Sequence, residues 1–259
     1  MSSKLKFSAK EVEGIFSKDR IQKLQNIYGL PFSDCVLLHE RLNELSGTIF
    51  ASLSIFEVHF RNIIDIQLST MISDNWYETS IFAADTLLSQ RINAAVFRAK
   101  ENAYSKLDYQ TRKTIKARYN GNRSKVRKLA IKSVATSKGD VISHLFFSFW
   151  RGLFSKKYEP RLWYFGLLKI FPNKSITRGE VSGHLETLHK VRNRIAHHEF
   201  VHPRLCEEYL KAIKFLTKEI RLLNVVRKGR VFRFQEAYIQ RIDYQLSSFR
   251  HFLDICETK

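Results

Sequence analysis

One long stretch without helix-breaking residues constrains this chain most. From Asp34 to Ile72 the sequence contains no proline and a single glycine, Gly47. Apolar residues recur through it at the three- and four-residue spacing of one helix face. They are Leu38, Leu42, Leu45, Ile49, Leu53, Phe56, Phe60, Ile63 and Ile64. The stretch therefore predicts one long helix, with Gly47 as the place where a kink is expected.

The rest of the chain also favours helices. Only 10 glycines and 4 prolines are spread over 259 residues, which leaves few of the breaks that a sheet-rich fold needs. We expect an all-α fold that forms a single domain over residues 1–259. Within it we expect an N-terminal helical extension over 1–30, a basic insert over 109–139 and a C-terminal helix over 225–259. Further helices are expected over 8–27, over 84–137 as one or two, and over 178–200, 204–227 and 231–256.

A large positive charge indicates a polyanionic partner. Lysine and arginine number 44 against 25 acidic residues, for a formal charge of +19. Neutralising phosphates releases counterions, so nucleic acid is the expected partner and a membrane surface the competing one. No segment has the roughly 18 apolar residues of a spanning helix, and the first residues lack the apolar centre of a signal peptide. Cys35, Cys206 and Cys256 are too scattered for a metal or disulfide pattern and suit buried thiols in a cytoplasmic protein.

The positive charge is concentrated in one segment. Between Asp108 and Asp140 there is no acidic residue. We interpret this segment as a surface that binds RNA phosphates, although a solvated helix face would have the same composition. The candidate RNA-binding residues are Arg112, Lys113, Lys116, Arg118, Arg123, Lys125, Arg127 and Lys128, and Lys132 and Lys138 extend the segment.

A second informative segment runs from Leu185 to Glu199. Leu188, Val191 and Ile195 form its apolar stripe. With about 100° per residue, His197 falls about 180° from Leu188 and should point away from the core. A histidine titrates near neutrality, and a nearby guanidinium such as that of Arg192 stabilises negative charge on a phosphate. These two groups suffice for RNA cleavage through the ribose 2′-hydroxyl, without a metal or cofactor.

The same helical geometry places Arg192 and His197 on different sides of the helix. Arg192 and His197 stand about 140° apart, so one phosphate is awkward to reach with both side chains of one chain. A two-fold homodimer would pool two copies of each in one cleft.

The hexamer Arg192-Asn193-x-x-x-His197 resembles the signature of HEPN ribonucleases. The longer run LHKVRNRIAHHE is similar to the site helix of the Abi-like, abortive-infection group of bacterial defence proteins. The segments Ser54–Asn62 and Phe147–Phe154 fit that group too, and the resemblance spans about residues 35–220.

The resemblance implies a HEPN-type helical bundle with additional N- and C-terminal helices. It implies a dimeric, metal-independent endoribonuclease of phage defence or of a toxin–antitoxin pair, with an antitoxin or a structured small RNA as further partner. The resemblance also implies a role for each residue of the hexamer: Arg192 binds the phosphate, Asn193 orients it and His197 is the acid or base.

Three further residues are candidates. Glu57 lies at the edge of the apolar stripe of the long helix, where a carboxylate needs a cationic partner. Arg61, one turn along, or Arg192 would serve. With Arg192 as its partner, Glu57 is a candidate catalytic residue that supports the site, and a purely structural ion pair is the alternative. Arg61 and Arg194 complete the candidate RNA-binding residues.

Other readings remain open. The chain could bind a folded RNA without cutting it, or the hexamer could be part of a surface helix in a structural protein. His184, His189, His197, His198 and His202 are close in sequence, but none of their spacings is typical of zinc sites. The many aromatic residues between 141 and 171 are expected to form core, with base stacking as the alternative.

Overall fold

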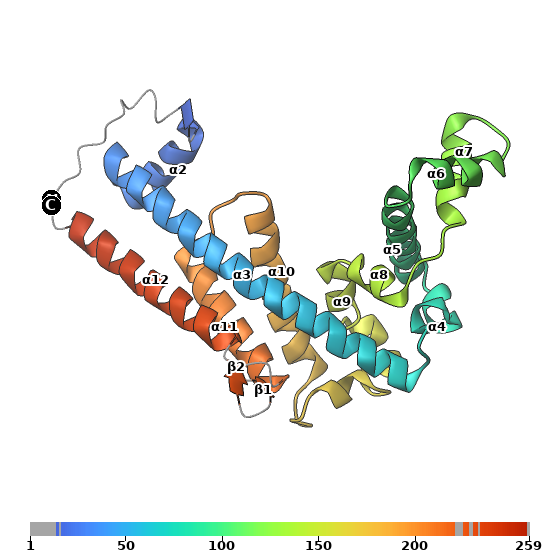
Figure 1. The fold of residues 1–259 in the computed structure, drawn as a ribbon. Coiled ribbons are helices and arrows are strands. Elements are labelled where there is room, and N and C mark those ends of the chain that lie inside the picture. The colour runs from blue at the N-terminus through green and yellow to red at the C-terminus, as the bar shows by residue number, and fades with distance from the viewer. Residues whose placement is uncertain (1–13, 16, 221–224, 228–229, 233, 258–259) are drawn as a thin grey trace. The chain divides into compact units, whose positions relative to one another are not determined.

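The computed structural model describes residues 14–15, 17–220, 225–227, 230–232 and 234–257. It forms two compact units, one from residues 1–56 and 184–259 and one from residues 57–183. Helices make up nearly all of the regular structure, so the fold is all-α, as predicted. Figure 1 shows the order of the elements along the chain.

The first unit is built from helices at both ends of the chain. It contains α2 (Lys18–Tyr28), α11 (Pro203–Glu219), α12 (Phe234–Glu257) and parts of α3 (Phe32–Met71) and α10 (Arg178–Ala196). The long helix expected from Asp34 is confirmed as α3, which continues through Gly47. Gly29 ends α2 in the left-handed conformation (φ +65°), where glycine costs least. The part of the helix expected over 8–27 that precedes residue 14 lies outside the described residues.

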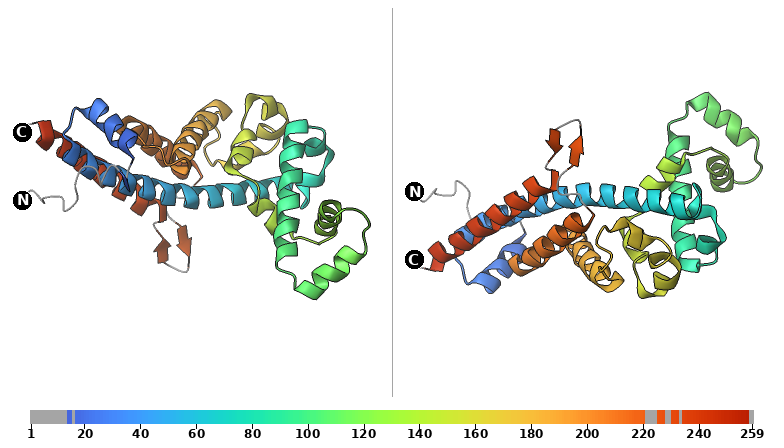
Figure 2. Two further views of the ribbon diagram at one scale, coloured as in Figure 1. Left: turned by 90° about the horizontal axis from the view of Figure 1, so that it is seen from above. Right: turned by 90° about the horizontal axis from the view of Figure 1, so that it is seen from below.

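Apolar side chains of α2, α3 and α12 share one core in the first unit. Ile21 and Leu24 of α2 pack with Leu38 and Leu42 of α3 and with Phe249 of α12. Figure 2 shows α12 running beside α3. Hydrogen bonds from Arg41 to Ser248 (3.1 Å) and from Ser52 to Gln235 (2.9 Å) fix these two helices as antiparallel neighbours.

A buried polar network joins three helices of this unit. The Tyr209 hydroxyl of α11 donates to Ser52 Oγ of α3 (2.8 Å), and Ser52 Oγ donates to Gln235 Oε1 of α12 (2.9 Å). Gln235 Nε2 donates back to the Ser52 carbonyl (2.9 Å). Because buried polar groups are costly unless they are paired, this network selects one alignment of the three helices.

The expected helices over 204–227 and 231–256 are corrected by the structure. Helix α11 ends at Glu219, and strands β1 (Val225–Arg227) and β2 (Arg230–Phe232) precede α12. The strands are antiparallel, with Val225 opposite Phe232 and Val226 opposite Val231 (Figure 2). The physical reason is local, since β-branched residues on both sides of a glycine favour a short hairpin over a helix.

The second unit consists of shorter elements that follow α3. They are η1 (Trp76–Glu78), α4 (Ser80–Ala83), α5 (Thr86–Ser105), α6 (Tyr109–Ala117), α7 (Arg123–Lys132), α8 (Lys138–Ser143), α9 (Phe147–Gly152), η2 (Lys156–Tyr158), η3 (Glu159–Trp163) and η4 (Leu167–Ile170). The segment 84–137, for which we expected one or two helices, forms three. The turn marked by Gly121 (φ +131°) is present, and Asn122 caps α7 by accepting from the Lys125 amide.

Aromatic side chains form the core of the second unit. Trp76 contacts the rings of Phe82, Phe149 and Trp150, with centroids 4.8–6.1 Å apart. The expectation that the aromatic residues between 141 and 171 form core is thereby confirmed for most of them. Three remain exposed, namely Phe146, Tyr164 and Phe165.

Asp85 anchors the start of α5. One carboxylate oxygen accepts from the amides of Leu87 (3.1 Å) and Leu88 (3.0 Å), and the other accepts from the Tyr158 hydroxyl (2.9 Å) and Lys157 Nζ (2.5 Å). The hydrogen bond from Lys157, more than the others, lowers the pKa of this buried carboxyl to about 2. Asp85 is therefore a charged cap at neutral pH.

Candidate functional site

The candidate site lies where α10 ends. The expected helix over 178–200 begins at Arg178 and stops at Ala196. The amide of His198 donates to the carbonyl of Ile195 (3.0 Å), and the amide of Glu199 donates to that of Arg194 (2.8 Å). This is the Schellman pattern, which requires a left-handed residue just after the helix. His198 takes that position with φ +56°.

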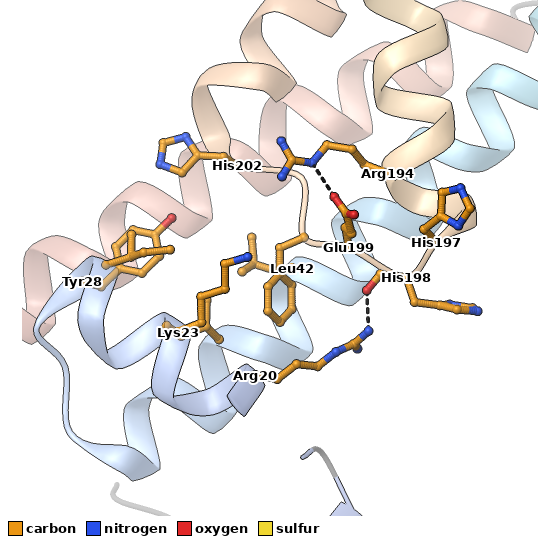
Figure 3. A pocket seen from close by; sticks show the side chains of 12 residues that line it. Arg20, Lys23, Tyr28, Leu42, Arg194, His197, His198, Glu199 and His202 are labelled. Carbon is orange, nitrogen blue, oxygen red and sulfur yellow. Dashed lines mark hydrogen bonds and ion pairs between the residues drawn. The ribbon is translucent and has the colours of Figure 1, made fainter. Parts of the chain in front are cut away.

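The turn after α10 borders a pocket of about 260 Å³ (Figure 3). Helices α2 and α3 and the segment before α11 complete its lining, all within the first unit. The basic side chains of the lining are Arg20, Lys23, Arg194, His197, His198 and His202. Glu199 is the only carboxylate among these lining residues, so the pocket is suited to an anion.

Two polar contacts hold the turn in place. Arg20 Nη2 of α2 donates to the carbonyl oxygen of His198 (2.5 Å). The Arg194 guanidinium pairs with the Glu199 carboxylate (Nε to Oε2, 3.1 Å). Both dashed contacts are visible in Figure 3, with the rings of His197 and His198 turned away from Leu42. The imidazole of His197 is exposed, which confirms the helical-wheel prediction that it points away from the core.

Side chains of α3 pack against Phe200, which follows the turn. His39 of α3 is buried, and its ring meets Phe200 edge to face with centroids 5.2 Å apart. The Asn43 amide lies 3.1 Å from His39 Nδ1. Burial, and second the charge of Arg20, lower the pKa of His39. The neutral form of His39 is therefore favoured beneath the site.

A second hollow next to the pocket is lined by α3 and α10. It measures about 460 Å³ and shares Arg20, His198 and Glu199 with the first. It adds Asn43, Ser46 and Gly47 of α3 and Ile195 of α10. The two hollows therefore adjoin each other at His198.

The other residues predicted for catalysis, and Arg61, which was predicted for RNA binding, do not line these hollows. Arg192 and Asn193 are half-buried on α10, and neither lines the two hollows. Asn193 Nδ2 donates to Nε2 of His189 (3.3 Å). Glu57 and Arg61 are half-buried on the part of α3 that belongs to the second unit. Their predicted roles stay predictions.

The basic segment forms a helical hairpin, α6 and α7, in the second unit. Arg127 pairs with Glu101 of α5 (2.8 Å), and Lys138 pairs with Asp65 of α3 (3.2 Å). Among the described residues no ion pair is made by the other candidates in this hairpin. These are Arg112, Lys113, Lys116, Arg118, Arg123, Lys125, Lys128 and Lys132. All are exposed except Arg112, which is half-buried.

Sequence reasoning did not identify Arg20 and Lys23 as site residues. They lie three positions apart on α2, beside the buried Ile21 and Leu24, so a basic face was visible in the sequence. No sequence signal indicates that this face meets a turn 178 residues away.

No family model, curated protein or solved structure matches this chain. None of the described helices is long and apolar enough to cross a membrane. In the described part of the chain, no three histidine, cysteine, aspartate or glutamate side chains are grouped so that they could hold a metal ion.

Proposed function

We propose that this protein is an RNA-binding, metal-independent endoribonuclease of the HEPN type. The observation that carries the proposal is the pocket at the end of α10. There an exposed imidazole, His197, stands beside Arg20, Lys23 and Arg194, and the one lining carboxylate is already paired with Arg194. Such a pocket combines an imidazole, which can accept or donate a proton, with fixed positive charge for a phosphate.

The chemistry follows from these groups. His197 takes the proton of a ribose 2′-hydroxyl, and the 2′-oxygen attacks the adjacent phosphorus. The cationic side chains stabilise the charge that develops on the phosphoryl oxygens. The bond to the 5′-oxygen breaks, and a second acid, such as a histidine of another copy, protonates that oxygen. The products are a 2′,3′-cyclic phosphate and a 5′-hydroxyl end, and DNA is not cut because it lacks the nucleophile.

A homodimer accounts for Arg192 in this scheme. Within one chain Arg192 does not line the pocket that contains His197. Two copies related by a two-fold axis would bring Arg192 of each to a shared cleft, as the resemblance to HEPN ribonucleases implies.

Cleavage of a labelled single-stranded RNA tests the proposal. We expect cleavage in EDTA, and none of DNA of the same sequence. His197→Ala should lower the cleavage rate by about 100-fold or more, because it removes the proton acceptor. Arg192→Ala should have a loss of similar size if the composite site exists. RNA affinity should stay within about twofold of wild type in both variants, because many phosphate contacts remain.

A matched control uses another exposed histidine. His251 of α12 lines neither hollow, so His251→Ala should cleave like wild type. Unchanged cleavage by His197→Ala would remove His197 from the mechanism. Unchanged cleavage by Arg192→Ala would remove only Arg192.

The basic hairpin favours a second candidate function. Its unpaired cations suit an RNA-binding protein that forms a stable ribonucleoprotein without turnover. In that case a discrete RNA would accompany the purified protein, and wild type and His197→Ala would be equally inactive in the cleavage assay.

The cellular role that we propose is phage defence or toxin–antitoxin control in the cytoplasm. Expression of an unrestrained ribonuclease should slow growth, and Arg192→Ala should abolish that toxicity while the protein stays folded. An antitoxin or a small RNA would restrain the wild-type protein.

A further inference from the structure

One face of α6 carries an aromatic ring followed by basic side chains. Tyr109, Arg112, Lys113 and Lys116 occupy positions i, i+3, i+4 and i+7, which lie on the same side of a helix. All four line a hollow of about 420 Å³ in the second unit. Residues of α5, among them Tyr104, and Arg127 of α7 complete it. The ring and the charges therefore face one shared space.

The hollow has an excess of positive charge. Glu101 is the only acidic residue of its lining, and its carboxylate is already paired with Arg127 (2.8 Å). Arg112, Lys113 and Lys116 make no ion pair with any described residue. Three basic side chains on one helix face thus remain available to phosphate groups.

Tyr109 offers an accessible ring for stacking. It is the first residue of α6 and is 68% exposed. The preceding Asp108 caps the helix, with its carboxylate accepting from the Thr111 amide (2.9 Å). The cap fixes the backbone from which the ring projects, and the exposed face of the ring can be covered by a flat partner.

A buried hydroxyl supports a polar ligand in this hollow. Tyr104 is 5% exposed, and its hydroxyl has no hydrogen-bond partner among the described residues. Buried polar groups in proteins are nearly always paired, so a ligand or a water that it brings would satisfy this one.

We propose that this hollow binds one unpaired nucleotide of single-stranded RNA. The base stacks on Tyr109, and Arg112, Lys113 and Lys116 bind the phosphates on either side. A duplex would not fit this description, because its bases are already stacked on one another. The inference rests on the proposed function in that it names where the RNA strand is held, at a site separate from the cleavage pocket.

Binding of a fluorescein-labelled single-stranded RNA to the full chain tests the site. Tyr109→Ala should weaken binding by about tenfold or more, the usual effect of losing one stacked base. Tyr109→Phe keeps the ring and should stay within about twofold of wild type. Binding of a duplex of the same sequence should not change in either variant. The double variant Lys113→Gln/Lys116→Gln should reduce the slope of log affinity against log salt by about 1.4, since each phosphate contact with a single strand contributes about 0.7.

Tyr164 supplies the matched control. It lies in the same unit with the same exposure, 68%, but does not line the hollow. Tyr164→Ala should therefore bind RNA like wild type. An equal loss in both variants would mean that the effect is not specific to this hollow and would overturn the proposal.

Photo-crosslinking supplies a readout that does not depend on cleavage. An RNA that contains 5-iodouridine should crosslink to the peptide with Tyr109 upon irradiation, because the excited base reacts with an aromatic ring that lies in contact with it. If Tyr109→Ala binds RNA like wild type, and the wild-type protein gives no crosslink at Tyr109, the nucleotide site is overturned and the ribonuclease proposal stands. If His197→Ala no longer cleaves RNA but still crosslinks at Tyr109, both the ribonuclease proposal and the nucleotide site are supported. A wild-type protein with no RNA affinity would overturn both.

Discussion

His198 takes a backbone conformation that glycine adopts more easily. Its φ of +56° is set by the two amide bonds that close the turn after α10. A side chain in this region costs about 1 kcal/mol relative to glycine. His198→Gly should therefore raise the free energy of unfolding by about 1 kcal/mol, as measured by urea denaturation. His198→Ala keeps the β-carbon and should give no such gain. A loss of stability in His198→Gly would mean that the imidazole makes contacts worth more than the strain.

For single residues, the sequence predicted whether a side chain is exposed better than it predicted which side chains it contacts. The exposure of His197 followed from its angle to Leu188 alone, which is a property of one helix. The sequence did not predict that Arg20 lies beside His197. The hydrogen bond from Arg20 to the His198 carbonyl depends on how α2 packs on α3 and on the turn. Such contacts come from tertiary structure, which residue spacing does not encode.

Among the elements, the network of Tyr209, Ser52 and Gln235 fixes the alignment of α3, α11 and α12. Gln235→Leu would remove the acceptor of the buried Ser52 hydroxyl and the side-chain donor to the Ser52 carbonyl, and only the bond from Tyr209 to Ser52 Oγ would remain of the network. We expect a loss of about 1–3 kcal/mol in the free energy of unfolding. Gln240→Leu, at an exposed position of the same helix, should change it by less than about 0.5 kcal/mol. Similar values for the two variants would show that the network contributes little.

Helices and strands were predictable where the pattern of apolar residues was long, and less so where it was short. Helix α3 repeats its apolar spacing from Leu38 to Ile64, about seven turns, so its existence and both ends were predicted closely. Strands β1 and β2 have three residues each, too few for an alternating pattern to outweigh the flanking helical ones. The division of 84–137 into three helices depends on caps, Asp108 and Asn122, that also occur in ordinary loops.

For the whole molecule, one buried histidine, His39, and one half-buried histidine, His59, link stability to pH. Burial lowers the pKa of His39 in the first unit and of His59 in the second. The unfolded chain then binds more protons below its histidine pKa of about 6.5 than the folded chain does. Stability is therefore complete above that pH and falls as the pH drops through it. The urea midpoint should decrease from pH 7 to pH 5.

Variants separate this effect from that of other groups. His39→Gln should make the decrease smaller, whereas His251→Gln, at an exposed position, should not. Asp85, with a pKa of about 2, stabilises the fold until the pH falls below about 4 and so adds nothing in this window. A midpoint that is constant from pH 7 to pH 5 would contradict the assignment.

The first unit takes its residues from both ends of the chain. During synthesis α2 and the first half of α3 leave the ribosome long before the segment that carries His197 and His202. A nascent chain therefore cannot form the pocket at the end of α10 until the segment with His202 has been translated, and a product that is truncated earlier cannot form it. Under the proposed ribonuclease function, this order of assembly keeps unfinished chains inactive.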